Sequence, residues 1–153
     1  MAGMGKVDYA RLQQFVDKVE SSLGGDQVDQ FMEACAKELA ARLLAKVVKR
    51  TPVGVYPHRV GGTLRRGWTA EQQQDVTSYV NSLQVTKTGG SYQIEIVNPV
   101  EYASYVEFGH RTRNHQGWVE GKFMLTISEQ EIRDAAPAIL ERKLQRKLGE
   151  AFK

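Results

Sequence analysis

Cysteine and long apolar runs are nearly absent from this 153-residue sequence. The one cysteine, Cys35, cannot close a disulfide within the chain or supply half of a Cys-x-x-Cys metal site. No stretch approaches the roughly 18 consecutive apolar residues of a transmembrane helix, and no apolar core of a signal peptide follows residues 1–6. These absences exclude a disulfide framework. We expect a protein that is made in the cytoplasm and does not contact a membrane.

A large charge of one sign is missing as well. The 21 Lys and Arg outnumber the 18 Asp and Glu only slightly, and the net charge of +3 permits a polyanionic partner without requiring one. The charge is unevenly distributed, since residues 1–35 carry three basic and six acidic side chains, whereas residues 50–70 carry four arginines and no acidic side chain. The sequence therefore predicts an acidic N-terminal portion and a locally basic loop.

Apolar residues at helical spacing predict a first helix over residues 7–23 and a longer amphipathic helix from Val28 to about Arg50. Asp26 is the expected N-cap of the longer helix, and Pro52 lies just beyond its end. Its apolar face is expected to contain Phe31, Cys35, Leu39, Leu43 and Val47, flanked by Ala36, Ala40 and Leu44.

The middle of the chain predicts loops and a small antiparallel sheet. Residues 51–67 contain so many glycines and prolines that we expect a long loop. Alternating apolar residues on both sides of Thr88-Gly89-Gly90-Ser91 predict a β-hairpin. Trp68 and the stretch Ser78–Val80 are candidates for further strand pairing.

The last third predicts two helices separated by a polar loop. Residues 101–109 form a short helix, which Gly109 ends in a left-handed turn, and residues 110–122 form the loop. Ser128-x-x-Glu131 is a capping-box pattern for a C-terminal helix, which Pro137 is expected to kink. In the short helix we expect four side chains to pack inward: Tyr102, Tyr105, Val106 and Phe108.

No pattern in the sequence indicates catalysis. His110 and His115 lie near Glu107 and Glu120, but their spacing is not that of a metal site. The sequence also lacks a P-loop, a dinucleotide-binding pattern and a nucleophile elbow. We therefore expect no enzyme activity, no metal and no cofactor.

Two stretches carry a more specific signal. The first is Arg50-Thr51-Pro52-Val53, followed by Gly62-Thr63-Leu64-Arg65-Arg66-Gly67-Trp68. The second is Asn98-Pro99-Val100-Glu101-Tyr102-Ala103-Ser104-Tyr105-Val106-Glu107-Phe108-Gly109. In this order they resemble the family of small phage tail-completion or head-to-tail joining proteins, which includes the minor tail protein Z of lambda-like phages. The similarity covers roughly residues 26–150, with an expansion at residues 54–61.

The resemblance implies an α+β fold: N-terminal helices including one long amphipathic helix, a small antiparallel sheet with a hairpin, a short helix and a C-terminal helix. It also implies one domain over residues 1–153, in which residues 26–153 form the tail-completion-like core. The implied function is a non-enzymatic virion protein, made in the bacterial host cytoplasm, that completes the tail and joins it to the head. Its implied partners are further copies in a ring, commonly six-fold in this family, the tail tube or tail terminator protein, and the head connector or stopper protein. DNA in the channel is a further possible contact.

Several residues are candidates for an interface or for the DNA channel. We expect Glu107 to pair with an arginine, either within the subunit or across an interface. We expect Trp118 either to lie beneath its loop or to insert into a neighbouring protein. A small nucleic-acid-binding module that uses Arg59, Arg65, Arg66 and the basic C-terminal helix is the alternative. Arginines beside aromatic residues suit phosphates and bases as well as a protein interface. The candidates are Arg59, Arg65, Arg66, Glu107, Arg111, Arg113, His115 and Trp118.

Overall fold

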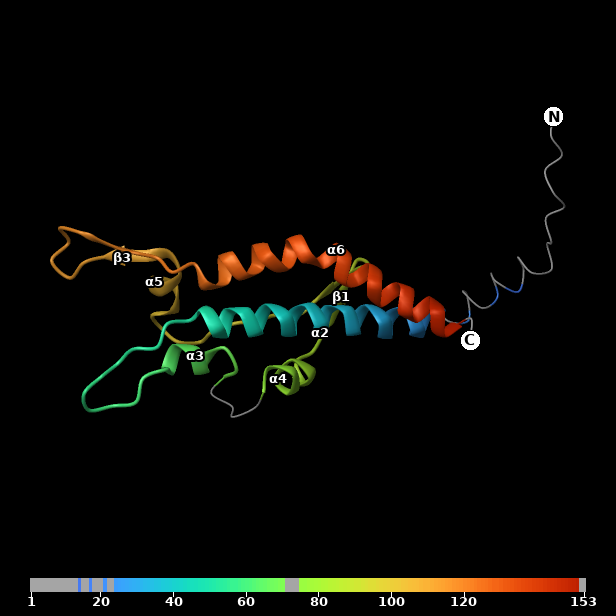
Figure 1. Cartoon of the computed structure of the whole chain (residues 1–153), viewed down its shortest axis with the longest axis horizontal. Helices are drawn as coiled ribbons and strands as arrows, with labels where there is room; N and C mark the ends of the chain where they lie inside the picture. The colour runs from blue at the N-terminus through green and yellow to red at the C-terminus, as the bar shows by residue number, and fades with distance from the viewer. Residues whose placement is uncertain (1–13, 15–16, 18–20, 22–23, 71–74, 152–153) are drawn as a thin grey trace, which may run out of the picture.

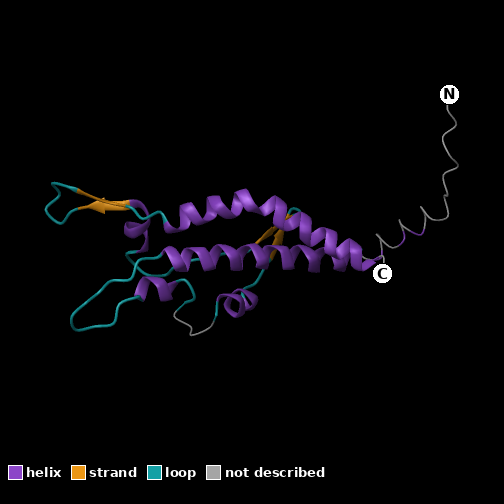
Figure 2. Ribbon diagram, viewed as in Figure 1, coloured by secondary structure: helices purple, strands orange, loops and turns teal. Residues whose placement is uncertain are grey.

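Two long antiparallel helices, α2 (Gly25–Arg50) and α6 (Met124–Ala151), form the body of the protein in the computed structural model (Figure 1). The structure describes residues 14, 17, 21, 24–70 and 75–151, so most of the helix predicted over residues 7–23 lies outside the described residues. Within the described residues, three short helices and two two-stranded antiparallel sheets accompany α2 and α6 (Figure 2). The predicted α+β class is confirmed.

α2 begins earlier than predicted. Gly24, not Asp26, is its N-cap residue, and the carbonyl of Gly24 accepts the N–H of Val28 at 3.0 Å. Asp26 lies in the first turn instead, where a carboxylate is favoured by the positive end of the helix dipole. Gly24 can serve as the N-cap because an N-cap residue takes an extended backbone, which Gly24 has (φ −63°, ψ 159°).

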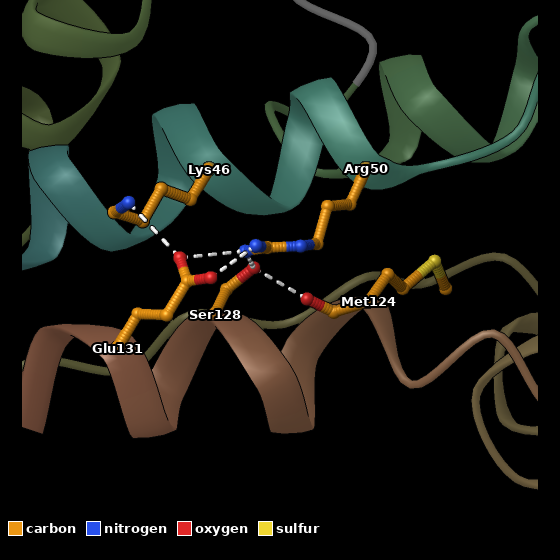
Figure 3. A network of polar contacts seen from close by, with 5 residues as sticks. All are labelled: Lys46, Arg50, Met124, Ser128 and Glu131. Atoms are coloured by element: carbon orange, nitrogen blue, oxygen red, sulfur yellow. Dashed lines mark hydrogen bonds and ion pairs between the residues drawn. The ribbon is translucent and has the colours of Figure 1, made fainter.

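A polar network joins the end of α2 to the start of α6 (Figure 3). Lys46 Nζ and Arg50 Nη1 each donate to Glu131 Oε2 at 2.9 Å, and Arg50 Nη2 donates to Glu131 Oε1. Arg50 Nη1 also donates to the hydroxyl of Ser128 at 3.0 Å, which in turn donates to the carbonyl of Met124 at 2.6 Å. The predicted capping box is therefore wrong. α6 begins at Met124, so Ser128 and Glu131 lie inside the helix and hold it against α2.

The hydrophobic core lies where α2 meets α6 and the short helices α3 (Thr63–Gly67) and α4 (Val76–Ser82). Cys35 and Val47 are buried as predicted, but Leu39 and Leu43 are only half-buried. α6 and α4 both pack against α2, and they bury Ala40 and Leu44, which were predicted only to flank the apolar face. Leu39 and Leu43 instead line an open groove. The core cluster consists of Ala40, Leu44, Val47, Leu64, Trp68, Val80 and Met124.

Thr51 connects the end of α2 to α3. Its fully buried hydroxyl donates to the carbonyl of Val47 at 2.6 Å and accepts the indole N–H of Trp68 at 2.7 Å. Its carbonyl accepts hydrogen bonds from Arg65 Nε and Nη2 at 3.2 and 2.8 Å. The prediction of a loop throughout residues 51–67 is therefore wrong at its end, because these contacts hold Thr63–Gly67 as a helical turn.

α4 occupies a stretch for which strand pairing was expected. The side chain of Asp75 accepts the N–H of Ser78 at 2.6 Å and caps the helix. Val80 is buried in the core, and Trp68 is the C-cap residue of α3 rather than part of a strand. Apolar alternation over such a short stretch does not separate a strand from one helical turn that buries a single side chain.

The predicted hairpin is confirmed but short. β1 (Thr86–Thr88) pairs with β2 (Ser91–Gln93), with Lys87 opposite Tyr92. Gly89 and Gly90 have positive φ values of 55° and 81°, as a tight hairpin turn requires. The flanking apolar residues at 83, 85, 94 and 96 lie outside the strands.

α6 contains Pro137 and bends part-way along its length (Figure 1), in agreement with the predicted kink. A proline inside a helix has no N–H for the hydrogen bond to the preceding turn, and its ring displaces the carbonyl four residues earlier. The bend lets α6 follow α2 along the body of the protein.

Gly67→Ala tests the contact between α3 and the segment before α5. A Cβ at Gly67 would lie 2.2 Å from Asn98 Oδ1, while Asn98 Nδ2 donates to the carbonyl of Leu64 at 2.7 Å. We expect the variant to lose about 1–3 kcal/mol of the free energy of unfolding, measured by urea denaturation. The matched control is Gly149→Ala, which has open space around the new Cβ and should gain about 0.5–1 kcal/mol. Equal stability of the two variants would contradict the contact.

Acid unfolding tests the network at Glu131. Hydrogen bonds from Arg50, and then from Lys46, lower the pKa of Glu131 from 4.5 to about 2. Because this pKa is depressed in the folded state, the contribution of Glu131 is fully present above about pH 4.5 and is lost as the pH falls toward 2. Over this range the free energy of unfolding of the wild type should fall more steeply than that of Glu131→Gln. Glu141→Gln on the same helix is the control and should keep the wild-type slope; parallel curves for Glu131→Gln would refute the prediction.

Candidate functional site

Three segments gather at the end of the helix pair where α2 ends and α6 begins (Figure 1). They are the loop at residues 52–61, which we call the arm, the helix α5 (Ala103–Phe108), and a second hairpin formed by β3 (Gly109–Arg111) and β4 (Trp118–Glu120). We call this region the distal end. The loop predicted over residues 110–122 is thus a hairpin, in which His110 lies opposite Val119.

Glycines allow the second hairpin to lie close to α5. Gly109 has φ 87° and ψ 173°, so it ends α5 with the predicted positive φ but not with a left-handed helical turn. A Cβ at Gly121 would lie 2.4 Å from the carbonyl oxygen of Glu107. That same carbonyl accepts the N–H of Phe123 at 3.0 Å, which turns the chain from β4 into α6.

Glu107 is the buried side chain of α5, with 5% of its surface exposed. Its Oε2 accepts the N–H of Leu125 at 2.9 Å, and its Oε1 accepts the N–H and the hydroxyl of Thr126 at 2.8 and 2.6 Å. Within the described part of the chain, Glu107 therefore accepts hydrogen bonds from backbone N–H groups and a hydroxyl rather than from an arginine. The carboxylate caps α6 from outside the helix, where the first N–H groups have no partner within the helix.

The aromatic side chains of α5 face outward rather than inward. Tyr102, Tyr105 and Phe108 are 44%, 59% and 61% exposed, and of the four side chains expected to pack inward only Val106 packs against the core. A helix of six residues has one narrow inner face, and the need to cap α6 places Glu107 there. The aromatic residues consequently lie at the surface of the distal end, where Trp118 of β4 is also 56% exposed. Large apolar side chains gathered at a surface mark interaction sites.

Residues 13–109 match a protein family described as "Bacteriophage HK97-gp10, putative tail-component". The match covers more than half of the chain. The chain belongs to the HK97-gp10-like family. The family resemblance noted in the sequence is thereby confirmed, and the protein is a phage tail component found in the virion. No curated protein and no solved structure matches the chain.

Within this tail component, the predicted site residues other than Glu107 divide into three groups. Arg65 donates to the carbonyl of Thr51, and Arg66 Nη1 donates to the carbonyl of Gly61 at 2.9 Å, so both hold local structure. Arg59 lies over the ring of Tyr56, 4.1 Å from its centroid, on the arm. The third group is exposed on the hairpin at the distal end: Arg111, Arg113, His115 and Trp118.

The described part of the tail component shows no arrangement that favours catalysis. No group of three or more His, Cys, Asp and Glu among the described residues lies close enough to hold a metal ion. His110 Nδ1 lies 2.8 Å from the carbonyl of Arg111, a contact that serves the hairpin. None of the described helices has the length and apolar character to cross a membrane.

Glu107→Gln tests the cap on α6. An amide retains one acceptor oxygen but directs N–H groups at the donors of Leu125 and Thr126. We expect a loss of about 1–3 kcal/mol in the free energy of unfolding, together with faster amide hydrogen exchange in the first turn of α6. Glu101→Gln, on an exposed residue two positions before α5, is the matched control and should leave both quantities unchanged. Slow exchange in the first turn of Glu107→Gln would argue against the cap.

Proposed function

We propose that this tail component completes the head-proximal end of the tail and joins it to the head connector, as a ring of copies. The protein acts as a structural part of the neck and not as an enzyme. The observation that carries the proposal is the distal end, where exposed aromatic side chains and arginines gather on a rigid framework. Aromatic residues and arginine are enriched in protein interfaces and carry much of their binding energy.

The framework of the distal end supports this role because it is fixed by buried hydrogen bonds. Thr51 holds the base of α3, and Glu107 holds α5 and the second hairpin to α6. A surface that is already ordered loses less conformational entropy when it binds a partner. The proposed partners are further copies in a ring, which we expect to be six-fold, the tail tube or tail terminator protein, and the head connector or stopper protein.

A nucleic-acid-binding module is the second candidate, and the structure supports it less. Arg65 and Arg66 are engaged with backbone oxygens, which leaves Arg59, Arg111 and Arg113 as its main phosphate contacts. Contact with DNA in the channel of the neck remains compatible with these three. Affinity for DNA that falls steeply with added salt and is lost in their alanine variants would favour this candidate.

Deletion of the gene from its phage tests the proposal. We expect filled heads and finished tails that do not join, and a wild-type copy supplied in trans should restore infectious particles. The variant Phe108→Ser/Trp118→Ser should fold, because both side chains are exposed, and yet fail to restore joining. Ala138→Ser, at an exposed position on α6 away from the distal end, is the control and should restore it. Normal particles from the deletion strain would overturn the proposal.

A further inference from the structure

An open groove runs beside α2 on the body of the protein. It has a volume of about 1000 Å³ and lies between α2, the start of α6 and the segment around β2. Glu95 and Glu129 are the charged residues that line it, and no Lys, Arg or His is among the described residues of its walls. The apolar part of the walls includes Leu39, Leu43, Leu83, Ile94, Leu125 and Ile132.

The arm has the complementary composition. Val55 and Val60 are 96% and 84% exposed, the highest values among the exposed large hydrophobic side chains. Arg59 stacks on Tyr56 between them, and no acidic residue occurs from position 50 to 70. The arm is thus apolar and basic, whereas the groove is apolar and acidic.

The arm is closed at its base. A Cβ at Gly61 would lie 1.8 Å from the carbonyl oxygen of Gly54, so the two ends of the arm nearly touch. Arg66 fixes this base through its hydrogen bond to the carbonyl of Gly61. Figure 1 shows the arm extending from the distal end, between α2 and α3, away from the helical body. Because its base is fixed, the arm loses little conformational entropy when it binds.

The groove of the same chain does not receive the arm. The arm residues line a different hollow of about 480 Å³, together with Tyr102 and Val106 of the distal end. No arm residue lines the groove. The complementary surfaces therefore lie at two different places on one molecule, which is the requirement for a head-to-tail contact between identical copies.

We propose that the arm of one copy docks in the groove of the next copy. Val55 and Val60 cover the apolar walls, and Arg59 pairs with Glu95. Glu129 already pairs with Arg133 at 2.8 Å, whereas Glu95 makes no ion pair with a described residue. Since every copy has one arm and one groove, the contact repeats until rotation closes a ring. This contact rests on the ring of the proposed function and names the surfaces that form it.

Cysteine cross-linking of the purified full chain tests the contact. In a Cys35→Ala background, the variant Val55→Cys/Gln84→Cys places one thiol on the arm and one on the groove wall. A short bismaleimide at high protein concentration should give a ladder of dimers, trimers and larger species, because each copy reacts at both ends. The single variants mixed together should give dimers only. The matched control, Val55→Cys/Ala138→Cys, places the second thiol on an exposed part of α6 outside the groove and should give no ladder.

A ladder no stronger than that of the control would overturn the proposal. Reaction of both thiols within one chain, seen as loss of thiols at unchanged monomer mass, would also overturn it, since the arm would then reach its own groove. Protection of the Gln84→Cys thiol from maleimide in dilute monomer would show that another segment of the same chain fills the groove, and would overturn it too.

A charge exchange tests the pairing of Arg59 with Glu95. Arg59→Glu should lower the yield of cross-linked species several-fold, and the second change Glu95→Arg should restore it. Arg142→Glu changes the net charge equally at an exposed position of α6, outside the arm, the groove and the distal end, and should leave the yield unchanged. Equal losses in Arg59→Glu and Arg142→Glu, without rescue, would refute the pairing.

The outcomes separate this proposal from the proposed function. Rings seen at tail ends by electron microscopy, without an arm-to-groove ladder in particles that carry the cysteine pair, would overturn the contact and leave the joining role standing. A ladder from a protein whose deletion leaves joined particles would keep the contact and overturn the joining role.

Discussion

The structure depends on how the backbone groups at one end of the helix pair are satisfied. α2 ends and α6 begins at the distal end, so the free carbonyls of one helix and the free N–H groups of the other meet in the same small region. The hydroxyl of Thr51 donates to the free carbonyl of Val47 at the end of α2. Thr51 also accepts hydrogen bonds from Trp68 at its hydroxyl and from Arg65 at its carbonyl. Glu107, on a separate helix, accepts hydrogen bonds from the free N–H groups of α6. Thr51 thus holds α3 through its hydroxyl and its carbonyl, and Glu107 holds α5 and the second hairpin to α6.

This requirement explains why the distal end presents aromatic side chains to solvent. The carboxylate of Glu107 occupies the inner face of α5 because its hydrogen bonds to the free N–H groups of α6 stabilise the fold more than a small apolar contact there would. Tyr102, Tyr105 and Phe108 are left exposed, as Trp118 on the second hairpin is. Burial of Glu107 therefore leaves aromatic side chains exposed at the distal end, and this is the surface that we propose for assembly in a tail.

The basic side chains are likewise divided between those that pair within the fold and those that remain exposed. The four arginines of residues 50–70 form one basic loop in the sequence, but Arg50 is held by Glu131 and Ser128, and Arg65 by Thr51. Arg59 is left on an arm without acidic neighbours in sequence. The net charge of +3 thus does not reveal the charged surfaces. The positions of the unpaired charged side chains distinguish the basic arm from the acidic groove.

The sequence by itself determined the long helix α2, the first hairpin with its glycine turn, the proline within α6 and the family. These features depend on the spacing of apolar residues, on the backbone conformations open to glycine and proline, and on the order of the motifs. All three can be recognised in a single sequence. Only the tertiary structure decided that Ser128 and Glu131 lie inside α6, that residues 63–67 and 76–82 are helical, and that Glu107 is buried while its aromatic neighbours are not. Each of these outcomes depends on a partner distant in the sequence: Arg50 for Glu131, Thr51 for Trp68 and the start of α6 for Glu107. A helical repeat shows which residues share a face, but the face that is buried is chosen by the groups that need a partner there.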